Sequence, residues 1–396
     1  MKVCFETFGC RLNKAEALQM EADCIARGWE VTDRHADANL IVVRGCSVTA
    51  RAQYECEKLV AHLKRRYPAV QIHVCGCLRT PDTSLASLSP ASRPGGETSE
   101  RPDCAPPVPT RTARAYLKVQ DGCAGKCTFC IVPKFRGPSR SEPFAELLDR
   151  ARRFIDAGYH EIVVTGCNLS LYASDGRRLP DLAAALSELD AGCRIRLGSV
   201  EPGACAMETI RVMAEHPNIC RFLHLPVQSG ANKTLLAMQR PYVVKDIEEA
   251  ATLAAKLMPG IGLGCDVITG FPGETDLDFA ATKGLLKRLP FNHAHVFPYS
   301  ERPGTLAAGF PCQLPKDVRS LRAKDISESI RSKRRKFAKS FVGRIVEIVV
   351  EDAKSGRGWT GEYLPCAPIG GTFVRKSVAR IFVTKTRDDL LIGRPQ

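Results

Sequence analysis

The chain has 396 residues, of which 44% are hydrophobic and 25% are charged, and its formal net charge is +14. This composition is ordinary for a globular protein with two or three domains and a sizeable core. No apolar run reaches the length of a membrane span, and the N-terminus lacks the apolar region of a signal peptide. We therefore expect a cytoplasmic protein with no membrane partner.

Cysteine and charge narrow the functional class further. The chain contains 18 cysteines, and in a long chain without a signal peptide this number favours metal or cluster ligation over disulfides. The excess of 57 Lys and Arg over 43 Asp and Glu fits a polyanionic partner such as nucleic acid. A generally basic surface is the alternative interpretation of the charge.

Residues 1–80 are expected to alternate between strands and helices. Predicted strands lie at 3–8, 40–43 and 70–74, and predicted helices lie at 14–27 and 50–66. This alternation is typical of a parallel sheet with helices on its faces. Loops that follow parallel strands meet at one edge of the sheet, where ligands usually bind.

Cys10, Cys46 and Cys77 each follow one of these strands, and a glycine directly precedes each of them. Their equivalent positions predict three thiols that converge at one sheet edge, rather than three unrelated buried cysteines. Glycine fits a loop that approaches a bulky group closely. Three thiols leave one iron of a cubane cluster without a protein ligand. Cys75 adds a fourth thiol, and spacing leaves the choice between Cys75 and Cys77 open.

Residues 81–112 are expected to be a linker. Pro, Ser, Thr and Gly dominate this stretch and no periodicity persists in it. Such a composition is typical of chain with little regular structure.

Residues 113–337 alternate between strands and helices again. Predicted strands lie at 116–119, 161–165, 194–198, 222–225, 262–269 and 294–298, with helices at 144–157, 180–189, 207–215, 244–257 and 277–289. Six strands with intervening helices predict a partial (β/α)6 barrel that is open on one side. The site of such a barrel lies at the carboxyl ends of its strands.

The first of these strands leads into a compact loop with three cysteines, Cys123-Ala-Gly-Lys-Cys127-Thr-Phe-Cys130. Such a loop can ligate three irons of a cubane cluster and leave the fourth iron open to a small molecule. A zinc loop is one alternative, but tetrahedral zinc needs four ligands and usually shows paired Cys-x-x-Cys knuckles. A disulfide with one spare thiol is the other alternative.

The C-terminal part changes from helix to β-structure. Residues 316–340 predict a long helix that contains the basic run Arg331-Ser-Lys333-Arg334-Arg335-Lys336, for which a solvated helix face is the alternative. Predicted strands follow at 345–351, 359–363, 373–381 and 389–392. Short strands broken by Gly and Pro predict a small barrel, and its basic character suggests a grip on nucleic acid.

An ordered set of motifs along the chain resembles one known family. The motifs are GCRLN (9–13), CSVTA (46–50), CGC (75–77), KVQDGCAGKCTFCIVPKFRGPSRS (118–141), VTGCN (164–168), SVEP (199–202), HLPVQSG (224–230), DVITGFPGE (266–274) and FPYSERPGT (297–305). The set resembles the radical S-adenosylmethionine (SAM) methylthiotransferases. Within that family, PSRS, SVEP and HVFPYSERPGT look most like the MtaB-type branch.

The resemblance implies an α/β chain with four parts. A flavodoxin-like methylthiotransferase domain spans 1–80, a linker 81–112, a radical SAM core 113–337, and a TRAM-like RNA-binding barrel 338–396. Three departures from the family stand out. One is the fourth thiol, Cys75; we expect Cys77 to be the ligand, because the pair Gly76-Cys77 resembles the family pattern. Arg44-Gly45 replaces the usual Asn-Thr before the second cysteine, and the linker stands where relatives usually have a further strand and helix.

The resemblance also implies two 4Fe–4S clusters. Cys123, Cys127 and Cys130 would hold the radical SAM cluster, whose open iron binds SAM, and Cys10, Cys46 and Cys77 would hold the auxiliary cluster. The implied contacts to SAM or substrate are Phe129, Thr165, Gly166, Glu201 and Gln228. For Glu201 and Gln228, a purely structural role at a strand end is the alternative.

The implied reaction adds a methylthio group to carbon 2 of N6-threonylcarbamoyladenosine next to the anticodon of tRNA. One SAM would methylate sulfur at the auxiliary cluster, and a second would be cleaved reductively to a radical that activates carbon 2. The implied partners are the tRNA anticodon loop, an electron donor such as flavodoxin or ferredoxin, and a sulfur source. Alternatives are a methylthiotransferase of N6-isopentenyladenosine in tRNA or of a ribosomal-protein aspartate, and a non-catalytic, zinc-containing RNA-binding protein.

Overall fold

The computed structural model describes residues 1–78 and 111–396. The chain forms two compact units, one of Met1–Arg111 with Ile131–Gly137, the other of Thr112–Cys130 with Pro138–Gln396. The predicted linker, and the expectation that it replaces a further strand and helix, lie almost wholly outside the described residues. Within the described ranges, no helix combines the length and the apolar character that a membrane span requires.

The first unit is built on a four-stranded parallel sheet with the order β2-β1-β3-β4. Its elements are β1 (Lys2–Thr7), α1 (Arg11–Ala26), β2 (Glu30–Val31), η1 (His35–Asp37), β3 (Leu40–Gly45), α2 (Ala50–Arg66), β4 (Gln71–Gly76) and α3 (Val132–Arg136). This strand order is that of the flavodoxin-like fold, which confirms the predicted class. The sequence pattern missed β2, because two residues are too short to show a period.

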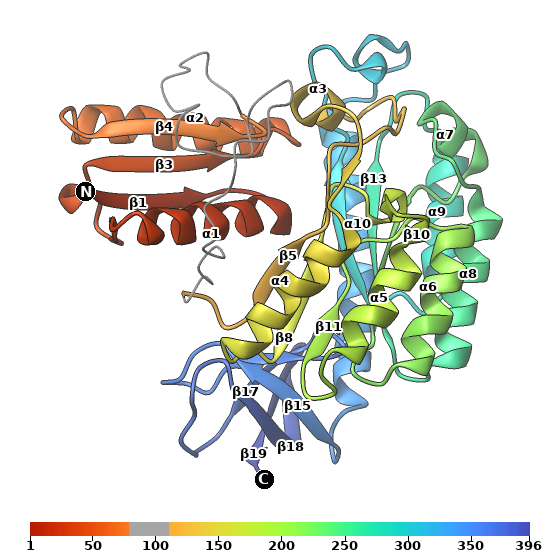
Figure 1. The fold of residues 1–396 in the computed structure, drawn as a ribbon. Helices are drawn as coiled ribbons and strands as arrows, with labels where there is room; N and C mark the ends of the chain where they lie inside the picture. The colour runs from red at the N-terminus through yellow and green to blue at the C-terminus, as the bar shows by residue number, and fades with distance from the viewer. Residues whose placement is uncertain (79–110) are drawn as a thin grey trace. The chain divides into compact units, whose positions relative to one another are not determined.

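Side chains of β3 alternate between the two faces of this sheet. Ile41 and Val43 pack against the α2 residues Cys56 and Leu63, whereas Val42 belongs to the apolar cluster beside α1. Figure 1 shows α1 and α2 on opposite faces of the sheet. Every residue of β3 is buried, which explains why its first four residues, Leu40–Val43, form a continuous apolar run rather than an alternating one.

The second unit contains the partial barrel that was predicted. Parallel ladders join β11-β8-β5 and β12-β13-β14, and the isolated parallel bridges Ile195↔Ile219 and Ser199↔His224 connect the two sets. Figure 1 shows α4, α5, α6 and α8 along the outer side of these strands.

The elements of the barrel run in chain order as follows. They are β5 (Ala115–Lys118), β6 (Gln120–Asp121), β7 (Arg140–Ser141), α4 (Phe144–Asp156), β8 (Glu161–Thr165), η2 (Leu169–Leu171), β9 (Ala173–Ser174), β10 (Arg177–Arg178), α5 (Leu179–Glu188), β11 (Arg194–Arg196), α6 (Ala204–Glu215), β12 (Phe222–Gln228), α7 (Asn232–Ala237), α8 (Val244–Leu257), β13 (Gly262–Thr269), α9 (Asp276–Arg288), β14 (His293–Pro298), η3 (Leu306–Gly309) and α10 (Lys316–Lys339).

The C-terminal strands form a closed barrel in the order β15-β16-β17-β19-β18. They are β15 (Ile345–Val350), β16 (Gly358–Thr360), β17 (Pro365–Pro368), β18 (Val378–Arg387) and β19 (Leu390–Pro395). The predicted strand at 373–381 corresponds to β18 but has the wrong bounds, since β18 begins only at Val378 and continues to Arg387. Lys376 has a φ of 75°, and a left-handed residue does not continue a strand. The two prolines of β17 concealed that strand from the sequence pattern.

A buried charge network fastens this C-terminal barrel to the radical SAM-like barrel. Arg196 Nε donates to Glu161 Oε1 at 2.7 Å and its Nη2 donates to the carbonyl of Thr360 at 2.9 Å. Arg194 Nη1 donates to the carbonyl of Glu347 at 3.0 Å. Burial alone would raise the pKa of Glu161, but the two guanidinium groups outweigh it and hold that pKa well below its usual range. The carboxylate therefore stays charged and keeps both arginines in place.

Candidate functional site

The three-cysteine loop lies between β6 and α3, and glycine lets its sulfur atoms gather. Gly125 N donates to Cys123 Sγ at 3.3 Å. A Cβ at position 125 would lie 3.1 Å from Cys123 Sγ and 3.8 Å from Cys127 Sγ. Cys130 N closes a turn on the carbonyl of Cys127 at 3.1 Å. A side chain at position 125 would press on Cys123 Sγ, whereas its separation from Cys127 Sγ would be an ordinary contact, so glycine eases the packing of the loop around Cys123.

Thr128 anchors this loop to the rest of the barrel. It is 2% exposed. Its Oγ1 donates to the carbonyl of Ala237 at 2.9 Å, and its backbone bonds to Met238 and Ala307 at 3.1 and 2.9 Å. The neighbouring Phe129 packs edge-to-face on Phe271 with ring centroids 6.4 Å apart. Sequence reasoning named Phe129 but missed Thr128, whose partners are more than 100 residues away.

Arg240 connects this loop to Glu201. Its Nη1 donates to Cys127 Sγ at 2.9 Å and its Nε to the hydroxyl of Tyr242 at 2.9 Å, while Nη2 pairs with the carboxylate of Glu201. Burial raises the pKa of the Cys127 thiol, and the charge of Arg240 opposes that rise. The predicted contact residue Glu201 is thus joined to the cysteine loop through an arginine that the sequence did not single out.

The other predicted residues lie at strand ends of the same barrel. Thr165 ends β8 and is 4% exposed. A Cβ on Gly166 would lie 3.0 Å from Gln120 Oε1, and that oxygen accepts from Asn168 N at 2.9 Å. Gln228 ends β12 with a φ of 60°, a left-handed conformation that a non-glycine residue adopts only under local constraint. Contact of these residues with SAM or substrate stays a prediction.

In the first unit, Cys10, Cys46 and Cys77 come together at the carboxyl edge of the sheet. Burial raises the pKa of the Cys46 thiol, and the neighbouring thiols of Cys10 and Cys77 add to that rise. A Cβ on Gly9 would lie 2.9 Å from Cys46 Sγ, and Gly9 has a φ of 91°. Gly9 therefore meets both conditions that favour glycine, a left-handed backbone and close approach to a neighbouring side chain.

Arg136 and Asn13 surround this group. Arg136 Nε donates to Cys77 Sγ at 3.1 Å and its Nη2 donates to Asn13 Oδ1 at 2.7 Å. Asn13 Nδ2 donates to the carbonyls of Phe8 and Gly45 at 2.8 and 2.9 Å. Burial raises the pKa of Cys77, and Arg136 opposes that rise. Asn13 lies in the motif GCRLN and Arg136 lies in the motif KVQDGCAGKCTFCIVPKFRGPSRS. Their place in these motifs is the feature of the sequence that could have identified them as site residues.

Cys75 has a different environment from Cys77. Its Sγ accepts from Arg44 Nη1 at 3.6 Å, and it packs beside the apolar cluster of Val3, Leu40 and Val42. Arg44 also pairs with the carboxylate of Glu16. Cys75 therefore lies on the α1 face of the sheet. Cys77 lies beyond the end of β4, where the alternation of strand side chains no longer applies.

The basic run of α10 is partly used inside the protein. Lys333 Nζ donates to the carbonyl of Leu286 at 2.6 Å, where it caps the end of α9. Arg334 Nε donates to Asp389 Oδ2 at 2.6 Å. Arg331 and Lys336 remain exposed. The interpretation of this run as a simple solvated face therefore fails for Lys333 and Arg334, which brace α9 and the C-terminal barrel.

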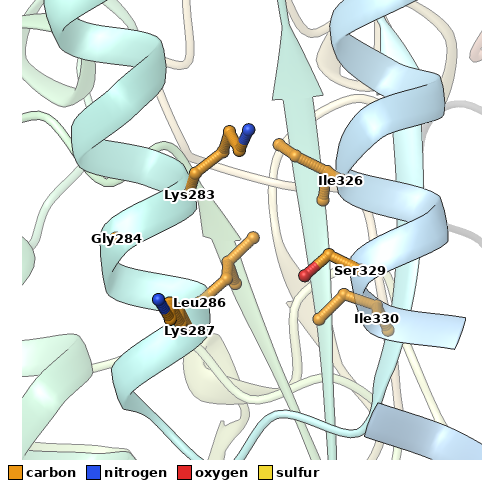
Figure 2. Close-up of a pocket in the computed structure, with 7 residues that line it drawn as sticks. All are labelled: Lys283, Gly284, Leu286, Lys287, Ile326, Ser329 and Ile330. Atoms are coloured by element: carbon orange, nitrogen blue, oxygen red, sulfur yellow. The ribbon is translucent and has the colours of Figure 1, made fainter. Parts of the chain in front are cut away.

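A shallow pocket lies between α9 and α10 (Figure 2). Its lining residues are Lys283, Gly284, Leu286, Lys287, Ile326, Ser329 and Ile330. Leu286 of α9 and Ile326 and Ile330 of α10 point into it, with the lysines at its rim. The lining offers no thiol, imidazole or carboxylate, so this pocket is a packing groove between two helices and not the reactive site.

Two family descriptions match the chain. Residues 117–286 match the Radical SAM superfamily and residues 2–91 match Uncharacterized protein family UPF0004. The tRNA-2-methylthio-N(6)-dimethylallyladenosine synthase of Chlorobium chlorochromatii is 33% identical, over 98% of this chain and 96% of the relative. The threonylcarbamoyladenosine tRNA methylthiotransferase MtaB of Bacillus subtilis is 31% identical, over 89% of this chain and 85% of the relative.

Among solved structures, the chain is similar to the radical SAM methyltransferase TsrM of Kitasatospora setae, with a TM-score of 0.56 and 14% identity over 78% of this chain and 77% of that one. That likeness supports the fold. The relatives that match nearly the full length of the chain show its family and the class of its reaction. The chain is an enzyme that uses SAM and a 4Fe–4S cluster to transfer a sulfur-containing group, and it belongs to the radical SAM tRNA methylthiotransferase family.

Proposed function

We propose that this enzyme adds a methylthio group to carbon 2 of N6-threonylcarbamoyladenosine in tRNA, next to the anticodon, with two 4Fe–4S clusters. Cys123, Cys127 and Cys130 ligate the radical SAM cluster. Cys10, Cys46 and Cys77 ligate the auxiliary cluster. Each triad leaves one iron open, which suits SAM at the first cluster and sulfur at the second.

One observation carries the two-cluster proposal. In each of the two units, an arginine donates directly to a cysteine sulfur: Arg240 to Cys127 at 2.9 Å and Arg136 to Cys77 at 3.1 Å. Each guanidinium also pairs with a carboxylate, Arg240 with Glu201 and Arg136 with Glu16. A positive charge beside a sulfur favours the thiolate form, and a cluster ligand is a thiolate. Both cysteine groups therefore fit an anionic iron–sulfur cluster.

The cluster and SAM, when bound, supply the radical that activates an unreactive C–H bond. The protein's own residues position the reactants. Thr128 and Phe129 fix the cysteine loop on the barrel, and Arg240 holds Glu201 beside Cys127. Thr165, Gly166 and Gln228 are proposed to face SAM or the adenine from neighbouring strand ends.

The choice of threonylcarbamoyladenosine rests on the motifs PSRS, SVEP and HVFPYSERPGT and on the MtaB relatives of Bacillus subtilis and Aquifex aeolicus, at 31% and 30% identity. N6-dimethylallyladenosine is the second candidate, because relatives named for that substrate match the chain equally well. The target base must leave its stack to reach the strand ends, which a single-stranded anticodon loop permits at low cost.

A paired assay separates the two substrates. Reconstituted enzyme is incubated anaerobically with SAM, a reductant and sulfide, and with one of two tRNAs, which carry either N6-threonylcarbamoyladenosine or N6-dimethylallyladenosine. Nucleosides are then analysed by mass spectrometry. We expect the 2-methylthio product only from the first tRNA. Product only from the second tRNA assigns the chain to the other branch, and product from neither contradicts the proposed function as a whole.

A further inference from the structure

Three neighbouring strands of the second unit bring two histidines and an aspartate together. They are His224 on β12, Asp266 on β13 and His295 on β14. In the ladder, Asp266 pairs with His295, and His224 pairs with Gly264. Gly264 and Asp266 lie on the same face of β13 because strand side chains alternate. The three side chains therefore share one face of a rigid parallel sheet.

Gly264 gives His224 the space to lean toward Asp266. A Cβ at position 264 would lie 2.6 Å from His224 Nδ1, a separation that real Cβ atoms do not reach. With glycine there, His224 Nε2 lies 3.1 Å from Asp266 Oδ1. The absence of a side chain on β13 is thus what makes the approach of the imidazole to the carboxylate possible.

The three ligand atoms are spaced like those of one metal ion. His224 Nε2 and His295 Nδ1 each lie 3.1 Å from the same oxygen, Asp266 Oδ1, and all three lie within 4.8 Å of one another. Bonds of about 2.0–2.2 Å at tetrahedral or octahedral angles separate neighbouring ligands by roughly 3.0–3.4 Å. Both imidazole–carboxylate separations fall in this range, so the three side chains are already close enough to share one ion.

The surroundings suit a site with an open position. Side-chain exposure rises from 7% for His224 through 25% for Asp266 to 53% for His295. Solvent and small molecules can therefore reach the three side chains from the His295 side, whereas the His224 side is shielded from water. His295 Nε2 lies 3.3 Å from His293 Nε2, close enough for a hydrogen bond between the two imidazoles that fixes the ring of His295. Asp266 Oδ1 faces a nitrogen of each imidazole, and one carboxylate oxygen with two imidazole nitrogens is a ligand set that zinc takes in proteins.

We infer that His224, Asp266 and His295 form a binding site for a divalent first-row transition-metal ion of the zinc class, separate from both cysteine triads. Two histidines and one carboxylate occupy three positions and leave the others open to water or to an oxygen or nitrogen of a bound molecule. This inference goes beyond the proposed function and does not depend on which nucleoside is modified.

Zinc itself is the probe. Cluster-loaded holoenzyme is equilibrated anaerobically with a small excess of Zn²⁺ and desalted, and zinc and iron per chain are measured together with the zinc K-edge absorption spectrum. We expect about one zinc with a nitrogen and oxygen shell at roughly 2.0–2.1 Å. In His224→Gln and His295→Gln, zinc is expected to fall toward zero while iron is unchanged.

His216→Gln is the matched control, because His216 is half-buried and its Nδ1 bonds to Ser187 Oγ at 2.7 Å, away from the triad. This variant should keep its zinc. Unchanged iron in the exposed-site variant His295→Gln reports that the chain is folded. The inference is overturned if the wild type retains no zinc, if both triad variants retain as much as the control, or if the spectrum shows a sulfur shell at about 2.3 Å, which identifies binding to thiols.

Discussion

The guanidinium Nη1 of Arg240 lies 2.9 Å from the sulfur of Cys127. The two residues are 113 positions apart, and the same guanidinium also holds Glu201 and Tyr242. A largely buried cation therefore contacts one of the three cysteines of the radical SAM loop. Groups beside a cluster sulfur set the charge that the cluster feels, and with it the reduction potential.

The contact between Arg240 and Cys127 predicts a shift of the cluster potential. Replacing Arg240 with Gln removes a positive charge that favours the reduced, more negative cluster, so the midpoint potential should become more negative. Activity should fall by about 10- to 100-fold, the usual effect of an altered outer partner. A redox titration followed by electron paramagnetic resonance measures the potential. Arg288→Gln, which breaks an exposed ion pair with Glu248, is the control, and equal potentials in both variants would contradict the assignment.

Arg136 should act on the other cluster only. It donates to Cys77 Sγ and to Asn13, so Arg136→Gln removes the charge that favours the thiolate. After anaerobic reconstitution, we expect iron to fall from about eight toward about four per chain, with the signal of the SAM-binding cluster retained. Arg136→Lys should recover part of the iron, because it restores the charge without the forked geometry. Loss of both clusters in Arg136→Gln would mean that the residue supports folding instead.

The environments of Cys75 and Cys77 predict opposite results for two neighbouring alanine variants. Cys77→Ala should behave like the triple variant Cys10/Cys46/Cys77→Ala and retain about four irons per chain, whereas Cys75→Ala should retain about eight. Cys75 packs toward the α1 face beside Arg44, away from the cysteine group. Iron and acid-labile sulfide analysis measures the difference, and the reverse pattern would assign Cys75 as the ligand.

Glu161 should govern stability at low pH. Its pKa is held well below the ordinary value of 4.5 by Arg196 and Arg194, against the effect of burial. A lowered pKa in the folded state gives stability that is complete above the unfolded value and is lost as pH falls through the folded one. The unfolding free energy should therefore decline below about pH 4.5 in the wild type, and less so in Glu161→Gln.

At neutral pH, Glu161→Gln should cost about 3–5 kcal/mol, because it leaves the buried guanidinium of Arg196 and the largely buried one of Arg194 without their negative partner. Urea unfolding across the pH range measures both effects. Glu208→Gln, which breaks the exposed pair with Arg178, serves as the control and should stay within about 1 kcal/mol of the wild type. Equal free energies for the two variants at neutral pH would show that the network contributes nothing to docking of the C-terminal barrel.

The C-terminal barrel should hold tRNA through phosphate contacts. Lys385, Arg387 and Arg394 are exposed on β18 and β19. If each neutralises one phosphate, replacing all three with alanine should flatten the slope of log affinity against log salt by about 2, at roughly 0.7 per contact. Filter binding or anisotropy at several salt concentrations gives the slope. Lys333 is not suitable as a control, because its amine caps α9 and its removal would also affect packing. Lys256→Ala, on α8 and outside the C-terminal barrel, is the control. An unchanged slope would remove these residues from the interface.

The sequence by itself determined the parts of this protein that follow from local pattern. The parallel sheet, the six barrel strands and the helices between them follow from apolar periodicity, so strands such as Glu161–Thr165 and Gly262–Thr269 have the predicted bounds. The two sets of three cysteines were found because each follows a strand or fills one short loop. Prediction failed where local pattern was weak, as in the two-residue β2 and the proline-containing β17.

Only the tertiary structure decided which side chains meet. Arg240 reaches Cys127, Arg136 reaches Cys77, and Gly264 admits His224 to Asp266. Each of these contacts joins residues on different elements, and most span many tens of positions in the chain. No periodicity within one element encodes such a pairing, because it depends on strand register and on which face each residue occupies. The sheet topology and the packing of its loops supplied that information.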